Sequence, residues 1–228
     1  MRKAKFKATS LFVGCILSAS VVTATTSWAD DNFETYEVTI TNIMQANTLA
    51  PVLVATHQAG ISFFKVGDAP DDELAWLSEV GDGRPMATKL LNTAGVSDVQ
   101  LSAGGIAAGK SKTVTVRAAR GMTTFSIGSM IGKTNDAFAG LRDVPLPKGR
   151  QVLTYEADGY DAGAERNDET TETVPACGLG AAAGYSGRST GEGFIFVSNG
   201  IRGKGCLDAA TLDWNNPVAS ITIKRVTN

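Results

Sequence analysis

Three acidic side chains in two short motifs have the spacing of a cation site. Asp161 and Glu165 lie four residues apart in the Gly-rich segment 160–165 (YDAGAE), where the chain can fold back and direct both carboxylates at one point. Asp136 belongs to a separate loop, in the motif 134–140 (TNDAFAG). Carboxylate oxygens are ligands that Ca²⁺ prefers. The residues alone leave two interpretations open, a calcium site formed by these three acids and a solvated acidic loop.

Paired carboxylates also perform acid–base catalysis, as in glycoside hydrolysis. Asp158, Asp161 and Glu165 would then supply the acid and the base of a hydrolase acting on an envelope or extracellular polymer. Sugar-cleaving sites also need an aromatic-lined cleft, and aromatic residues make up only 7% of this chain. We therefore keep the hydrolase as the alternative to a non-catalytic binding protein.

The other motifs with possible chemistry lack the partners that they need. His57 is the only histidine, so a Ser-His-Asp or Cys-His site must use it, and the chain has no G-x-S-x-G motif. A single histidine also excludes a His-rich zinc site. Segment 104–111 (GGIAAGKS) matches the phosphate-binding pattern, but that mechanism requires a helix directly after the motif. An alternating strand pattern follows instead, so we interpret the segment as a Gly-rich hairpin connection and not as a nucleotide site.

Residues 1–29 have the pattern of a secretory signal peptide. An apolar run from about residue 11 to residue 22 is too short to span a bilayer, and a small-x-small cleavage site ends at Ala29. Four basic residues precede the run: Arg2, Lys3, Lys5 and Lys7. We expect a secreted or periplasmic mature chain, 30–228, without a membrane span. A rival interpretation is a lipoprotein box with Cys15 as the lipidated residue, although the apolar run continues past it.

The charge of the mature chain argues against two classes of partner. Cleavage removes four basic residues and no acidic one, which moves the formal net charge from −2 to −6. A mildly acidic, exported protein is a poor candidate for binding nucleic acid or anionic lipid. A protein or glycan ligand outside the cytoplasm is the expected kind of partner.

Two cysteines, Cys177 and Cys206, remain after cleavage. Thiols left as a pair in an oxidising compartment usually form a disulfide, which here would close a loop of about 30 residues and stabilise the fold by about 2–4 kcal/mol. Two free buried thiols are the alternative.

Short segments with the period-two pattern of half-buried strands dominate the mature sequence. Residues 36–43 alternate Tyr36, Val38 and Ile40 with polar residues, and 112–118 and 220–226 repeat the pattern. More continuous apolar runs predict strands buried on both faces, at 51–56, 61–66 and 193–198. Further candidates lie at 123–131 and 151–155. Strands at this density predict an all-β fold, an antiparallel β-sandwich that forms a single domain over 30–228.

One region departs from the strand pattern and predicts a helix. Segment 68–81 begins with a capping residue, an early proline and three acids, and continues with Leu74, Leu77 and Val80 at helical spacing before Gly81 ends it. A second short helix is predicted at 86–92. We expect both helices to pack across one edge or end of the sandwich.

The motifs described above resemble the spondin domain, the β-sandwich named for F-spondin and mindin and also found in exported bacterial proteins. The resemblance extends from about Phe33 to Val226. Its blocks are 36–42 (YEVTITN), His57 after the second strand, 63–67 (FFKVG), 77–82 (LSEVGD), 135–141 (NDAFAGL) and 160–163 (YDAG). The last two blocks are the sharpest.

The resemblance implies a C2-like β-sandwich with a Ca²⁺ ion bound by its loops. The family's metal ligands match Asp136, Asp161 and Glu165, although the family carries Asp at the last position and its aromatic residue near Asp136 is displaced here to Phe138. Glu reaches one methylene further than Asp and binds Ca²⁺ in bidentate fashion. The implied function is an exported calcium-binding module for adhesion or recognition. The additional adhesive modules of the animal proteins are absent from this sequence.

Overall fold

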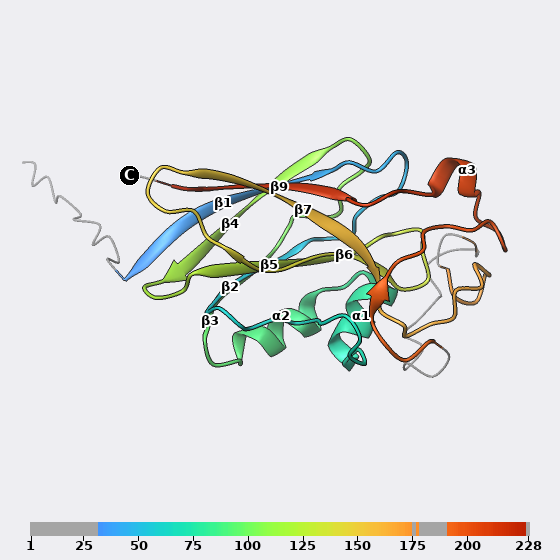
Figure 1. Ribbon diagram of the computed structural model, residues 1–228, viewed down its shortest axis with the longest axis horizontal. Coiled ribbons are helices and arrows are strands. Elements are labelled where there is room, and N and C mark those ends of the chain that lie inside the picture. The colour runs from blue at the N-terminus through green and yellow to red at the C-terminus, as the bar shows by residue number, and fades with distance from the viewer. Residues whose placement is uncertain (1–31, 175–176, 178–190, 227–228) are drawn as a thin grey trace, which may run out of the picture. The chain divides into compact units, whose positions relative to one another are not determined.

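The computed structural model describes residues 32–174, 177 and 191–226. The predicted signal peptide, Cys15 and most of the loop after Cys177 lie outside these residues. Figure 1 shows the described strands and helices. In chain order they are β1 (Phe33–Asn42), β2 (Leu53–His57), α1 (Asp72–Val80), α2 (Arg84–Leu91), β3 (Val96–Leu101), β4 (Ser111–Ala119), β5 (Thr124–Met130), β6 (Ala137–Pro145), β7 (Val152–Asp161), β8 (Phe196–Val197), α3 (Ala209–Leu212) and β9 (Ala219–Arg225).

The strands form a nearly closed antiparallel sheet that folds over as a sandwich, which confirms the predicted all-β class. The strand order is β3-β2-β5-β6-β7-β9-β1-β4, and β8 pairs with β7. Strand β7 belongs to both layers, because 152–157 pairs with β9 while 158–161 pairs with β6. Gly159 lies where β7 changes layer, and a Cβ atom there would lie only 2.8 Å from Trp214 Nε1.

Side chains close the seam between the first and last strands of this order. Strands β3 and β4 lie side by side, but no backbone ladder joins them within the described residues. Instead, Asp98 Oδ2 accepts a hydrogen bond of 2.7 Å from the Arg117 amide, and Ser97 Oγ accepts one of 2.7 Å from the Ala119 amide. Thr56 Oγ1 on β2 donates to the Arg117 carbonyl.

The alternation in the sequence produces the core between the two layers. Apolar residues of β1, β4 and β9 point inward and are buried: Tyr36, Val38, Ile40, Val114, Val116, Ile221 and Ile223. Strands β2 and β5 are buried at every residue, as the continuous apolar run at 51–56 predicts for β2. Such strands need apolar cover on both faces.

Helices α1 and α2 supply that second cover, packing on the face of β2, β5 and β6 that lies away from the first core (Figure 1). The expectation that they lie at an edge or end was therefore wrong. Helix α1 starts after Asp71, whose Oδ1 accepts from the Leu74 amide at 2.8 Å, and it ends at Gly81, which adopts a φ of 74°. A second core fills the space between the helices and the sheet, and includes Phe63, Phe64, Leu74, Leu77 and Phe138.

Three other predictions are corrected or confirmed by the described strands. Segment 61–66 is a loop and not a strand, because Gly60 and Gly67 turn the chain at φ values of 88° and 92° while Phe63 and Phe64 insert into the second core. Of 193–198, only Phe196–Val197 pairs as a strand. Segment 104–111 leads directly into β4 without a helix, as predicted, but it crosses between the layers and does not form a hairpin.

The predicted disulfide joins Cys177 to Cys206, with Cα atoms 5.7 Å apart. Beside it, the carboxylate of Glu169 is 4% exposed and organises the loop that contains Cys206. Its Oε1 accepts from the Arg202 amide at 2.6 Å, and its Oε2 accepts from the Lys204 amide at 2.7 Å. Glu169 thus holds this loop through backbone amides, a role that the sequence does not indicate.

Replacing Glu169 by alanine is expected to lower the free energy of unfolding by about 2 kcal/mol, because the amides of Arg202 and Lys204 lose a charged acceptor. Urea denaturation of the oxidised protein measures the change. Glu172→Ala, three residues away on an exposed side chain, is the matched control and should stay close to the parent value. An equal loss in both variants would contradict the assigned role.

Candidate metal centre

The sheet brings the two acidic motifs together at one end of the sandwich. Asp136 directly precedes β6, and Asp161 is the last residue of β7. These strands are antiparallel neighbours with Ala137 opposite Asp161, and the Ala162 amide donates to the Asp136 carbonyl at 3.2 Å. The pairing of β6 with β7 therefore juxtaposes two acids that lie 25 positions apart in the sequence.

Asp136 is fully buried, and only one of its carboxylate oxygens is satisfied. Oδ2 accepts hydrogen bonds from the Ala164 amide at 2.6 Å and from the Glu165 amide at 2.9 Å. Oδ1 has no hydrogen-bond partner within the described part of the chain. A buried carboxylate oxygen left without a donor is costly, so this atom requires a proton or a cation.

Asp161 is 2% exposed and is held by its own turn. Its Oδ1 accepts from the Gly163 amide at 2.8 Å, and its Oδ2 accepts from Asn167 Nδ2 at 2.8 Å. Gly163 adopts a φ of 68°, and a Cβ atom there would collide with the Phe194 carbonyl. The glycine of the motif thus allows the turn to pack closely against the segment before β8.

Burial makes both carboxylates costly to ionise, and the charge of Asp161 adds to that cost at Asp136. Burial, followed by the charge of Asp161, raises the pKa of Asp136 well above its ordinary value of 3.8. Burial also raises the pKa of Asp161 to about 6, although the hydrogen bonds from Asn167 and Gly163 oppose this rise. Two neighbouring buried acids with raised pKa values are typical of a site that binds a proton or a metal ion.

Glu165 is buried in the same turn, but the neighbouring charge that raises its pKa most is that of Glu79 on α1. The side chain is 3% exposed, and burial together with the charge of Glu79 raises its pKa to about 8. Within the described residues, no three His, Cys, Asp or Glu side chains are grouped so as to hold a metal ion. The donor chemistry of Asp136 and Asp161 suits a hard cation such as Ca²⁺, while the role of Glu165 as third ligand stays a prediction.

Sequence reasoning missed the acids and the amide that surround the predicted set. Glu79 is 2% exposed on α1, four residues after the buried Ala75 and so on the same helix face. Asn167 bridges Asp161 to Glu192, donating to Glu192 Oε1 at 3.1 Å. The helical spacing from Ala75 was a usable signal for Glu79, whereas no local pattern marks Asn167 or Glu192.

The carboxylates proposed for a hydrolase do not converge in the same way. Asp158 lies three residues before Asp161 on β7, and the alternation of a strand directs these two side chains to opposite faces.

The single histidine is inaccessible. His57 Nδ1 lies 2.8 Å from the Gln58 carbonyl oxygen, which makes Nε2 the acceptor for Ser126 Oγ at 2.8 Å. Both His57 and Ser126 are buried, so this Ser–His pair has no opening for a substrate.

Comparisons with known proteins do not identify the chain. Scans against protein-family profiles and against curated protein sequences find no match. In the described part of the structure, no helix has the length and apolarity needed to cross a bilayer.

Proposed function

We propose that this protein is an exported, calcium-binding recognition module of the spondin type, in which Ca²⁺ joins the loop of Asp136 to the turn of Asp161 and Glu165. The observation that supports this proposal most strongly is the orphaned Oδ1 of Asp136, which is buried beside the carboxylate of Asp161. The carboxylate oxygens of Asp136 and Asp161 are hard donors, the kind of ligand that Ca²⁺ takes from Asp and Glu side chains.

A cation accounts for this arrangement better than ordinary hydrogen bonding does. The Ala164 and Glu165 amides both donate to Oδ2 of Asp136, which leaves Oδ1 without a donor among the described residues. A bound divalent ion would neutralise both carboxylates and supply the missing partner. The resemblance of 135–141 and 160–163 to the spondin motifs favours the same residues as ligands.

In this function the metal ion shapes a surface and performs no chemistry. The turn after Asp161 contacts the segment before β8 through the Gly193 amide, which donates to the Gly163 carbonyl at 2.8 Å, and through the Gly191 amide, which donates to the Ala164 carbonyl at 3.1 Å. Fixing the turn therefore also fixes this segment. Recognition sites of sandwich folds commonly lie on such loops, and an extracellular protein or glycan is the expected ligand.

Metal analysis of the purified mature protein tests the proposal. We expect stoichiometric calcium after dialysis against calcium-containing buffer, loss of it with chelator, and no retention by Asp136→Asn. Asp158→Asn, which changes a carboxylate on the same strand as Asp161, should retain calcium as the parent does. Absence of calcium from the parent protein under these conditions would refute the metal site. A pull-down from extracellular material, with and without Ca²⁺, then tests recognition.

A further inference from the structure

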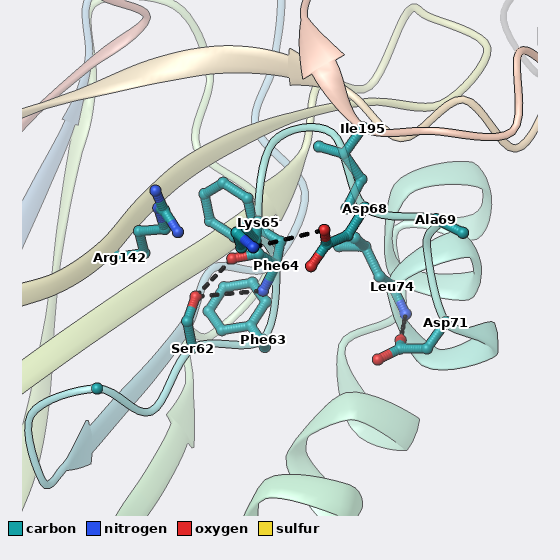
Figure 2. A pocket seen from close by; sticks show the side chains of 11 residues that line it. Ser62, Phe63, Phe64, Lys65, Asp68, Ala69, Asp71, Leu74, Arg142 and Ile195 are labelled. Atoms are coloured by element: carbon teal, nitrogen blue, oxygen red, sulfur yellow. Dashed lines mark hydrogen bonds and ion pairs between the residues drawn. The ribbon is translucent and has the colours of Figure 1, made fainter.

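A second site lies between the loop after β2, the start of α1 and strand β6 (Figure 2). It is a pocket of about 360 Å³, within the size range of small-ligand sites. Phe63, Phe64, Leu74 and Ile195 form its apolar wall, and all four are buried. Arg142 reaches it from β6, while Lys65, Asp68 and Asp71 supply the other charges. None of the three predicted calcium ligands lines it.

A β-bulge places Arg142 at this pocket. Phe125 pairs with Val144 and Ile127 pairs with Leu141, so Arg142 and Asp143 together stand opposite Ser126 alone. A bulge of this kind redirects side chains and recurs next to binding sites. Here it forces Asp143 to a φ of 51°, a conformation that a residue with a side chain rarely adopts.

Hydrogen bonds hold the bulge in this strained form. The Asp143 amide donates to Ser126 Oγ at 2.9 Å, and Asp143 Oδ2 accepts from the amide of Gly60, a pocket residue, at 2.9 Å. Backbone strain persists only where the surroundings impose it, and it concentrates at functional sites. The bulge is thus tied to β5 through Ser126 and to the pocket through Gly60.

Lys65 and Arg142 are the cationic side chains that line the pocket, and Arg142 has no acidic partner among the described residues. Lys65 Nζ lies 3.7 Å from Asp68 Oδ1, and Asp71 accepts from Lys89 at 2.6 Å while capping α1. Arg142, in contrast, forms no ion pair or hydrogen bond with any other described residue. Its guanidinium lies 5.9 Å from the ring centroid of Phe64, and Figure 2 shows it beside that ring and away from both acids.

We propose that this pocket binds the carboxylate of a ligand with a compact apolar body, with Arg142 as the carboxylate-binding residue. The planar guanidinium matches a carboxylate through two parallel hydrogen bonds. A single negative charge fits the one cation of the described lining that has no acidic partner, whereas Asp68, Asp71 and Asp143 would repel a dianion such as phosphate. The apolar wall then receives the body of the ligand. This site stands independently of the calcium proposal.

The same chemistry can come from a free small carboxylate or from the carboxyl terminus of a peptide. Titrations of the purified protein, followed by its amide NMR signals, distinguish the two sources. The probes are phenylacetate, the peptide Gly-Gly-Phe with a free carboxyl terminus, and two neutral controls, phenylacetamide and the same peptide amidated. We expect saturable shifts around Gly60, Lys65 and Arg142 with an acid and none with its amide.

Arg142→Gln is expected to weaken binding of the acid about tenfold or more. Arg142→Lys should weaken binding by a smaller factor, because lysine keeps the charge but cannot form the two parallel hydrogen bonds of the guanidinium. Arg150→Gln, an exposed arginine at another pocket, is the matched control and should bind as the parent does. Binding of phenylacetate but not of the peptide acid would indicate that the pocket takes free small carboxylates. Binding of the peptide acid but not of phenylacetate would indicate that it takes the carboxyl terminus of a chain. No saturation with either acid, tighter binding of inorganic phosphate, or an unchanged affinity in Arg142→Gln would overturn the proposal.

Discussion

Saturating calcium is expected to raise the melting temperature of the protein, and Asp136→Asn is expected to remove that rise. A ligand at about 100 times its Kd stabilises the folded state by about 2.7 kcal/mol. For a domain of roughly 200 residues this corresponds to a shift of about 5–10 °C. Thermal melts in calcium and in chelator, followed by circular dichroism, measure the effect.

A matched control variant in calcium and the melting of Asp136→Asn in chelator test the same metal site. Asp158→Asn changes a carboxylate on the other face of β7 and should keep the full calcium-dependent rise. In chelator, Asp136→Asn should melt above the parent protein, because it removes one of two repelling buried charges. An unchanged parent melting temperature in calcium, combined with a stabilised Asp136→Asn, would mean that the two acids share a proton and bind no metal.

Without calcium, the free energy of unfolding is expected to fall as pH rises from 3.8 to about 8. The pKa of Asp161 rises from 3.8 in its ordinary setting to about 6 in the fold, and that of Glu165 rises from 4.5 to about 8. A raised pKa means that the folded state binds the proton more tightly than the unfolded chain does. The bound proton contributes its full stabilisation below the pKa of the unfolded chain. That contribution is lost as pH rises through the pKa of the folded protein.

Denaturation in urea across this pH range, with chelator present, measures the loss. The raised pKa of Asp161 corresponds to a loss on the order of 3 kcal/mol, and Glu165 should extend the decline toward pH 8. Asp161→Asn should flatten the curve near pH 6 and Glu165→Gln near pH 8, so each variant identifies its own step. Stability that increases with pH over this interval would contradict the raised pKa values.

The sequence predicts best the strands in which one face alone is buried, whereas a continuous apolar run identifies β2 at 51–56 but misleads at 61–66. Alternation in β1, β4 and β9 fixes which side chains point inward, whatever the partner strand is. Strand β6 is not evident in the sequence because three of its first four residues, Ala137, Ala139 and Gly140, are small and carry little strand preference. They are small for a tertiary reason, since a Cβ atom at Gly140 would lie 2.7 Å from the ring of Phe64.

The position of the helices and the surroundings of the site depend on contacts that no local pattern records. The spacing of Leu74 and Leu77 shows that α1 has a buried face, but not which surface buries it. In the same way, the motifs identify Asp136 and Asp161 as neighbours, while the burial of Glu79 beside Glu165 follows only from the docking of α1 on the sheet. The bulge at Arg142 is also invisible in the sequence, because it arises from the register between β5 and β6.

The side-chain closure of the β3–β4 seam has a consequence for how copies of this protein behave in a crowded solution. An exposed strand edge is a template for pairing with another chain and the usual starting point of aggregation. Here the outward amides of Arg117 and Ala119 are already occupied by Asp98 and Ser97, so this edge is closed to a strand from a second molecule. Two polar side chains thus protect the protein from association at the seam that the described strands leave without a backbone ladder.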